Sequence, residues 1–167
     1  DPVSARVRRL QAAYALATPD RAPFNFNLGA VEAVEKICLA RVPFVFLAEH
    51  SCEATVPPPY NRWIAVRAGG NPERIALKGH DEYTIRFSDL AAVAARHGYD
   101  ILRGPVADFL EIDFSPELES ILRARHVSAG VRETVRHFVE DLFQYEYLLL
   151  RRRGVEFRVE TPPKSEG

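Results

Sequence analysis

The stretch Val42–Glu53 reads VPFVFLAEHSCE and decides the fold that we expect for this chain. Its first half is apolar at every position from Phe44 to Ala48, a pattern typical of a central strand with both faces buried. Its second half, Glu49–Glu53, is polar or ionisable throughout. A buried strand that carries such groups to its end is one common way to build a site, and it is also a common way to end a strand.

Further short strands separated by turns are expected in the middle of the chain. The segments Gly69–Pro72 and Gly79–Glu82 have the composition of turns between neighbouring strands. Tyr83, Ile85 and Phe87 alternate with polar residues, which indicates a half-buried strand. We therefore expect a small antiparallel or mixed sheet with strands near 43–49, 62–68, 73–78 and 83–87, and a further strand or extended arm at 155–160.

Helices are expected on both sides of these strands. Asp1 followed by Pro2, and Ser115 followed by Pro116, combine a capping residue with a first-turn proline. Ser128 opens a long C-terminal helix with a broad apolar face. The expected helices span about 1–17, 28–41, 89–97, 116–125 and 128–153. The order of elements predicts a single α+β domain over 1–160. A C-terminal tail at 161–167 follows, which we expect the domain or a partner to hold.

The overall charge argues against nucleic acid as a partner. The chain has 167 residues and a net charge of −1, so it has no basic excess to attract phosphates. The helix expected at 89–97 and the short helix or turn that follows could form a helix-turn-helix, but this region is acidic and would repel a phosphate backbone. Its carboxylates are Asp89, Asp100, Asp108, Glu111 and Asp113, against few arginines. No apolar run approaches the ~20 residues that span a bilayer. We therefore expect protein partners, no nucleic acid and no transmembrane segment.

Composition also suggests a compartment. Two cysteines, Cys38 and Cys52, are too few for a disulfide framework and indicate reduced thiols. The sequence starts at Asp1 without any methionine, and 19 of its 22 basic residues are arginine. We expect a processed protein on the matrix side of the mitochondrion, with a cytoplasmic protein as the alternative.

Cys52 is the candidate for nucleophilic catalysis. A thiol nucleophile needs a neighbouring base, and His50 or His80 could serve. His50 and Cys52 lie two residues apart, however, and such neighbours in an extended chain are ~6.5 Å apart, too far for a direct hydrogen bond. We therefore favour a strand end with a half-buried cysteine. A small thiol-dependent hydrolase or transferase, with Cys52 as the nucleophile, is the alternative.

The sequence shows no recognised metal or phosphate motif. A metal site would draw on the His, Cys and acidic residues of the two polar segments, which are His50, Cys52, His80, Asp81 and Glu82. Their spacing matches no established ligand pattern, and a solvated turn explains the second segment equally well. The Gly69–Asn71 segment lacks the glycine spacing of a phosphate loop and leads to a strand. We predict no metal and no cofactor.

A protein-binding surface is the function that the sequence favours. The proline run Pro57-Pro58-Pro59-Tyr60 offers a stiff ridge, and the apolar face of the 128–150 helix exceeds what one contact needs. The predicted partner-binding residues are Pro57, Pro58, Pro59, Tyr60, Phe138, Phe143, Tyr145 and Tyr147. We expect a non-catalytic accessory or scaffold subunit of a multiprotein complex, such as a peripheral subunit of a mitochondrial respiratory or ATP synthase complex. A homodimer through the long helix is a further alternative.

Overall fold

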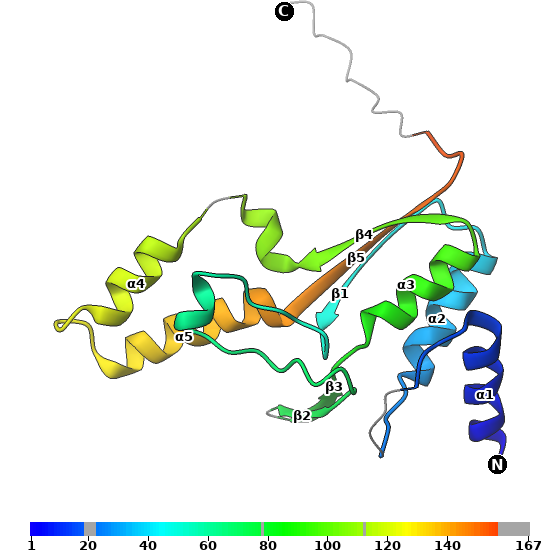
Figure 1. The fold of residues 1–167 in the computed structure, drawn as a ribbon, viewed down its shortest axis with the longest axis horizontal. Coiled ribbons are helices and arrows are strands. Elements are labelled where there is room, and N and C mark those ends of the chain that lie inside the picture. The colour runs from blue at the N-terminus through cyan, green and yellow to red at the C-terminus, as the bar shows by residue number, and fades with distance from the viewer. Residues whose placement is uncertain (19–22, 78, 112, 157–167) are drawn as a thin grey trace, which may run out of the picture.

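The computed structural model describes residues 1–18, 23–77, 79–111 and 113–156 (Figure 1). Its helices are α1 (Pro2–Tyr14), α2 (Leu28–Leu39), α3 (Phe87–Arg96), α4 (Ser115–Arg123) and α5 (Ala129–Gln144), with short 3-10 turns η1 (Tyr60–Arg62) and η2 (Val106–Leu110). Its strands are β1 (Phe44–His50), β2 (Arg74–Leu77), β3 (His80–Tyr83), β4 (Tyr99–Pro105) and β5 (Tyr145–Arg152). The predicted α+β class is confirmed.

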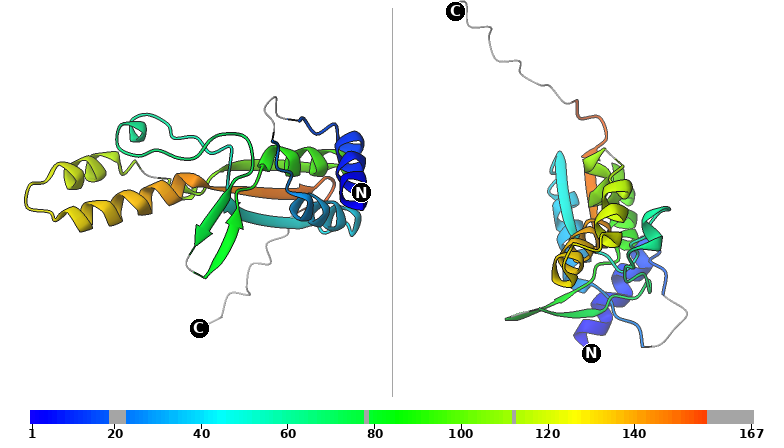
Figure 2. Two further views of the ribbon diagram at one scale, coloured as in Figure 1. Left: turned by 90° about the horizontal axis from the view of Figure 1, so that it is seen from below. Right: turned by 90° about the vertical axis from the view of Figure 1, so that its left-hand side faces the viewer.

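The main sheet has three antiparallel strands in the order β1-β5-β4. The register aligns Phe46 with Leu149 and Leu149 with Leu102, so these three side chains form one row across the sheet. β2 and β3 form a separate hairpin, which stands out from the body of the molecule (Figure 2).

The prediction of a long C-terminal helix at 128–153 is correct as far as Gln144 and wrong beyond it. The helix ends at Gln144 and the chain continues directly into β5, which is the middle strand of the sheet. β1, predicted to be central, is an edge strand. The physical reason lies in Tyr147–Leu150, where consecutive apolar and aromatic residues fit a buried strand as well as a buried helix. Pairing with β1 on one side and β4 on the other decides for the strand.

Two other predicted strands were also wrong. Residues 62–68 form no strand, because the backbone N–H and carbonyl of Arg67 bond to the side chain of Gln144 at 2.7 and 3.1 Å. The strand predicted at 83–87 is displaced to His80–Tyr83, since the hairpin turns earlier, next to Gly79, whose φ is +98°. Residues 155 and 156 are not in a strand. The rest of the predicted arm and the tail 161–167 lie outside the described residues.

Helices α1, α2 and α3 cover one face of the sheet, called here the inner face (Figure 1). Its apolar half is formed by Val45, Leu47, Ile101, Leu148 and Leu150, which alternate along their strands with the side chains of the opposite face. Leu10, Val31, Val34, Phe87, Leu90 and Val93 pack against it from the helices. This is the larger of two hydrophobic clusters.

The second cluster lies at the other end of the molecule. α4 and α5 form a helical hairpin that extends away from the sheet, and the connection after β1 runs alongside it (Figure 1). The buried side chains of this cluster are Tyr60, Ile64, Leu118, Val139 and Phe143. Because α5 continues without a break into β5, the two clusters share one continuous backbone segment. No helix in the described part of the chain is long and apolar enough to cross a bilayer.

Candidate functional site

The polar end of β1 lies beside the β2–β3 hairpin. His50 Nδ1 is 3.3 Å from Glu82 Oε2 and 3.7 Å from Glu49 Oε1. His50 is buried, and its ring lies against Tyr145 with 3.9 Å between centroids. His80 Nε2 is 2.9 Å from the other Glu82 oxygen. Hydrogen bonds from His80 and His50 hold the pKa of Glu82 below its ordinary value, against a smaller opposing effect of desolvation.

The cluster includes three of the five residues considered for a metal site. His50, His80 and Glu82 come together, and Glu49 joins them. Asp81 instead pairs with Arg74 on the neighbouring strand. Glu49 belongs to the polar segment Glu49–Glu53 that the sequence indicated as a place for a site, but it was not counted among the candidate metal ligands.

Cys52 lies apart from this cluster, inside the protein. Its side chain is 2% exposed, and Sγ donates to the carbonyl of Ile85 at 3.5 Å. Burial, reinforced by the negative charge of Glu53, raises the pKa of the Cys52 thiol to about 12. Since the thiolate is the nucleophile, this environment works against thiol catalysis. The geometry therefore gives the thiol-dependent enzyme no support.

A partly buried ionic network occupies the polar half of the inner face, with Glu146 buried and Arg103 29% exposed. Arg103 of β4 donates to Glu146 of β5 at 2.9 Å and to Glu53 at 3.2 Å. Ser51, which is fully buried, donates to Glu146 as well. Glu146 and Arg103 face inward because they lie two residues from Leu148 and Ile101 along their strands. The network satisfies buried charges, so its first role is structural.

Glu53 also fixes the start of α3. Its carboxylate accepts from the backbone N–H of Ser88 at 2.8 Å and from the Ser88 hydroxyl at 2.5 Å. A negative charge there suits the positive end of the helix dipole. Asp89 is buried in the same first turn, 4.0 Å from Arg86, and burial raises its pKa to about 6. Sequence reasoning missed this network, because its members are spread from Ser51 to Glu146.

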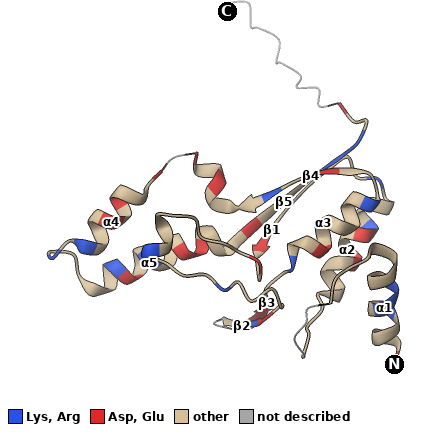
Figure 3. Cartoon of the chain, in the orientation of Figure 1, with Lys and Arg blue, Asp and Glu red and all other residues tan. Residues whose placement is uncertain are grey.

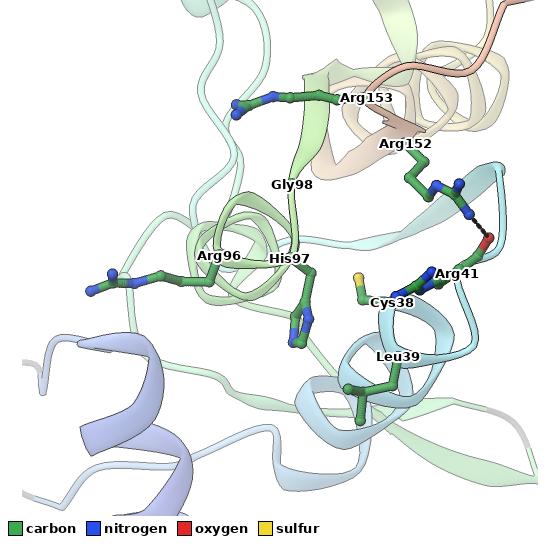
Figure 4. A pocket seen from close by; sticks show the side chains of 8 residues that line it. All are labelled: Cys38, Leu39, Arg41, Arg96, His97, Gly98, Arg152 and Arg153. Carbon is green, nitrogen blue, oxygen red and sulfur yellow. Dashed lines mark hydrogen bonds between the residues drawn. The ribbon is translucent and has the colours of Figure 1, made fainter.

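A basic pocket of about 640 Å³ lies where α2 and α3 end, next to the end of β5 (Figure 4). Its lining includes Arg41, Arg96, His97, Arg152 and Arg153. Arg152 donates to the carbonyl of Arg41 at 3.2 Å, and Arg153 bonds to Asp100. Figure 4 shows the side chains of Arg96 and Arg153 directed away from His97, so the charges do not converge on one point. Charge at two helix C-termini accounts for Arg41 and Arg96.

The face of the sheet opposite α1–α3 carries exposed apolar side chains and is called here the open face. Phe46 is 55%, Leu149 37% and Leu102 56% exposed, and these three form the row that crosses all three strands. Phe109 of η2 lies over the end of this face, 4.5 Å from Tyr147 and 5.9 Å from Phe46 between ring centroids. η2 approaches closely because Gly104 has no side chain; a Cβ there would lie 2.2 Å from Asp108.

The predicted partner-binding residues are divided between surface and core. Tyr60 and Phe143 are packed in the second cluster, and Tyr147 is buried beneath Phe109. Tyr145 is half-buried against His50. Pro59 is half-buried, and the exposed members are Pro57, Pro58 and Phe138. The residues that sequence reasoning missed are Phe46, Leu102, Leu149 and Phe109.

Comparison with known proteins adds no assignment. No protein-family model, curated protein or solved structure matches this chain. Function is therefore inferred from the chain's own residues and their arrangement.

Proposed function

We propose that this chain is a non-catalytic subunit of a protein assembly and that it docks through the open face. The observation that carries the proposal is the row Phe46–Leu149–Leu102, which exposes apolar side chains on all three strands of the sheet. A sheet normally buries its apolar face against another layer. Clustered apolar residues on a surface mark interaction sites far more often than single exposed ones do.

The occupant that fits this face is a second copy of the chain. Charge is distributed unequally along the strands (Figure 3). Arg151 and Arg153 lie at one end, where they share Asp100. Asp108 and Glu111 lie in and just after η2 at the other end, and neither forms an ion pair with another described residue. A two-fold axis that runs along the apolar row, perpendicular to the strands, would place the basic end of each chain over the acidic end of its partner.

The dimensions of the face indicate a weak dimer. Three strands spaced about 4.8 Å apart give a surface only about 15 Å wide, well below a standard interface. We therefore expect dissociation in roughly the micromolar range. Assembly into the larger complex would then add partners around this pair. The mitochondrial setting expected from composition remains part of the proposal.

Sedimentation velocity over a concentration series tests the second-copy arrangement. The wild-type chain is expected to pass from monomer to dimer, and Leu102→Asp is expected to stay monomeric. Phe138→Asp is the matched control, because Phe138 is 63% exposed but lies on α5, away from the open face. A wild-type chain that stays monomeric at all concentrations, or a dimer that Leu102→Asp leaves intact, contradicts the proposal.

Exchanging the charges at the two ends of the strands tests how the two copies are oriented. Arg151→Glu is expected to weaken the dimer by placing like charges together at both ends. The double variant Arg151→Glu with Asp108→Arg is expected to restore it, since the two ends are exchanged in sign. Failure of the double variant to recover any association would exclude the two-fold arrangement.

A further inference from the structure

The polar end of β1 has the geometry of a metal site, independently of the open face. Three donor atoms, from Glu49, His50 and Glu82, all lie within 4.8 Å of one another. A divalent ion with bonds of about 2.1 Å sets neighbouring ligand atoms roughly 3.0 to 3.4 Å apart, depending on its geometry. The His50–Glu82 distance of 3.3 Å lies in this range, and the His50–Glu49 distance of 3.7 Å is slightly longer.

A hydrogen bond accounts for the His50–Glu82 contact, although it is a long one, and does not account for the His50–Glu49 contact at 3.7 Å. A good N–H···O bond measures about 2.9 to 3.0 Å, shorter than the His50–Glu82 separation. Glu49 Oε1 also accepts from the backbone N–H of His50 at 3.1 Å, which holds this carboxylate beside the ring. The carboxylates of Glu49 and Glu82 bring two negative charges to the same nitrogen, and a single proton on the ring neutralises only one of them. A divalent cation would neutralise both.

The site is held in place before any ion arrives. His50 is buried and is fixed in the strand by pairing with Tyr145, and its backbone carbonyl accepts from the backbone N–H of Ile85 at 2.7 Å. His80 bonds to the Glu82 oxygen that faces away from His50. Partners of this kind orient a ligating carboxylate, so we assign His80 as a positioning residue.

A second cluster in the chain shows what a non-binding arrangement looks like. His137 of α5 also lies between two carboxylates, from Glu133 and Glu140. These contact opposite nitrogens of its ring, each at 3.0 Å, so no single point is shared by all three groups. His50 differs because both carboxylates approach the same nitrogen, Nδ1.

We propose that Glu49, His50 and Glu82 bind a first-row divalent cation of the Zn²⁺ class. Mixed nitrogen and oxygen donors favour such an ion over Mg²⁺ or Ca²⁺, which prefer oxygen alone. The ion would join β1 to β3. This link matters because, among the described strands, β2 and β3 pair only with each other, and the bridge between Ser51 and Ile85 lies at the base of the hairpin, outside its strands. A two-stranded hairpin with so little support is marginal in water.

Calorimetric titration of the full chain with ZnCl₂ tests the site. One ion per chain is expected. Glu82→Gln, which keeps the size of the side chain, is expected to weaken binding by about 100-fold or more, and His50→Ala likewise. His80→Ala is expected to cost about tenfold, in keeping with a positioning role. His137→Ala is the matched control and should bind as the wild type does.

Hydrogen exchange gives a second readout, which is independent of the heat measured by calorimetry. Zn²⁺ is expected to slow exchange of the β2–β3 amides in the wild type and to have no effect on them in Glu82→Gln. Circular dichroism of each metal-free variant checks that it is folded. The proposal is overturned if the wild type binds no Zn²⁺, or if Glu82→Gln and His137→Ala bind as tightly as the wild type.

Discussion

The two faces of the main sheet are built from the same three strands and have opposite surroundings. Leu148, Leu149 and Leu150 are consecutive residues of β5, yet their exposed fractions are 0%, 37% and 0%. The inner leucines lie under α1–α3, whereas Leu149 lies in the open row with Phe46 and Leu102. Side-chain type does not distinguish the faces. What distinguishes them is the helical layer, which covers only one.

The largest difference between the faces should appear on truncating leucine. Leu150→Ala removes buried methyl groups and leaves a cavity, so we expect it to lower the free energy of unfolding by about 3 to 5 kcal/mol. Leu149→Ala changes the same residue type one position away and should cost less than about 1 kcal/mol. Urea denaturation of both variants measures the difference. Equal losses would mean that the open face is covered within the monomer.

Breaking an ion pair should also cost more stability on the inner face than on the open face. Arg103→Ala leaves buried Glu146 without its cation, which we expect to cost about 2 to 4 kcal/mol. Arg151→Ala breaks an exposed pair with Asp100 on the open face and should cost less than about 1 kcal/mol. Chemical denaturation at low ionic strength compares the two. A cost for Arg103→Ala as small as that for Arg151→Ala would show that water reaches the network.

Asp89 lies in α3, in the helical layer over the inner face, and should make the free energy of unfolding depend on pH. Its pKa of about 6 when folded exceeds the ordinary value of 3.8, so the folded state binds more protons between these values. The contribution of this carboxyl to stability therefore falls as pH rises from about 4 to 6. We expect Asp89→Asn to be more stable than the wild type by about 1 to 3 kcal/mol at pH 7, and the gain to disappear near pH 4.

Asp100 is the control for this effect on the open face. Hydrogen bonds from Arg151 and Arg153 hold its pKa below the ordinary value, which is the opposite direction. Asp100→Asn should therefore lose stability at pH 7 rather than gain it. Thermal melting across the pH range checks both variants, and a stability gain for Asp89→Asn that does not vary with pH would refute the assignment.

The smallest effect on stability is expected at Phe46, the end of the open row that lies on the edge strand β1. Phe46→Ser replaces a side chain that is more than half exposed, so the free energy of unfolding should change by no more than about 1 kcal/mol. Binding of an apolar fluorescent dye should fall in the same variant, because the row loses its largest group. A marked loss of stability would indicate that the contacts of Phe46 with Phe109 and Tyr147 stabilise the monomer, so that this end of the row is not free for docking.

Sequence reasoning identified the class of the fold because local signals decided it. The Asp1 cap with Pro2 and the Ser128 cap both start helices where expected, and the apolar run Phe44–Ala48 is a strand. It failed in the segment that became β5, where the unbroken apolar run Tyr147–Leu150 carries no periodicity to separate strand from helix. Only pairing across more than 40 residues, with β4 and β1, settles that segment.

The candidate sites were predictable only in part, for the same reason. His50, His80 and Glu82 were considered together because their side chains have the right chemistry. Glu49 was noted in the polar segment but not counted as a metal ligand, and Phe46 and Leu102 were not predicted to bind a partner. The register of the strands and the packing of the helices decide which strand residues face a covering layer. Local sequence patterns predict neither of these.

The most direct test of the docking proposal is the sedimentation coefficient of the isolated chain as a function of concentration, measured for the wild type and for Leu102→Asp. The account predicts a monomer–dimer transition in the wild type and a monomer throughout in the variant, with both equally stable to urea. A wild-type chain that remains monomeric at the highest concentration, or a variant that associates equally well, would contradict docking of a second copy on the open face.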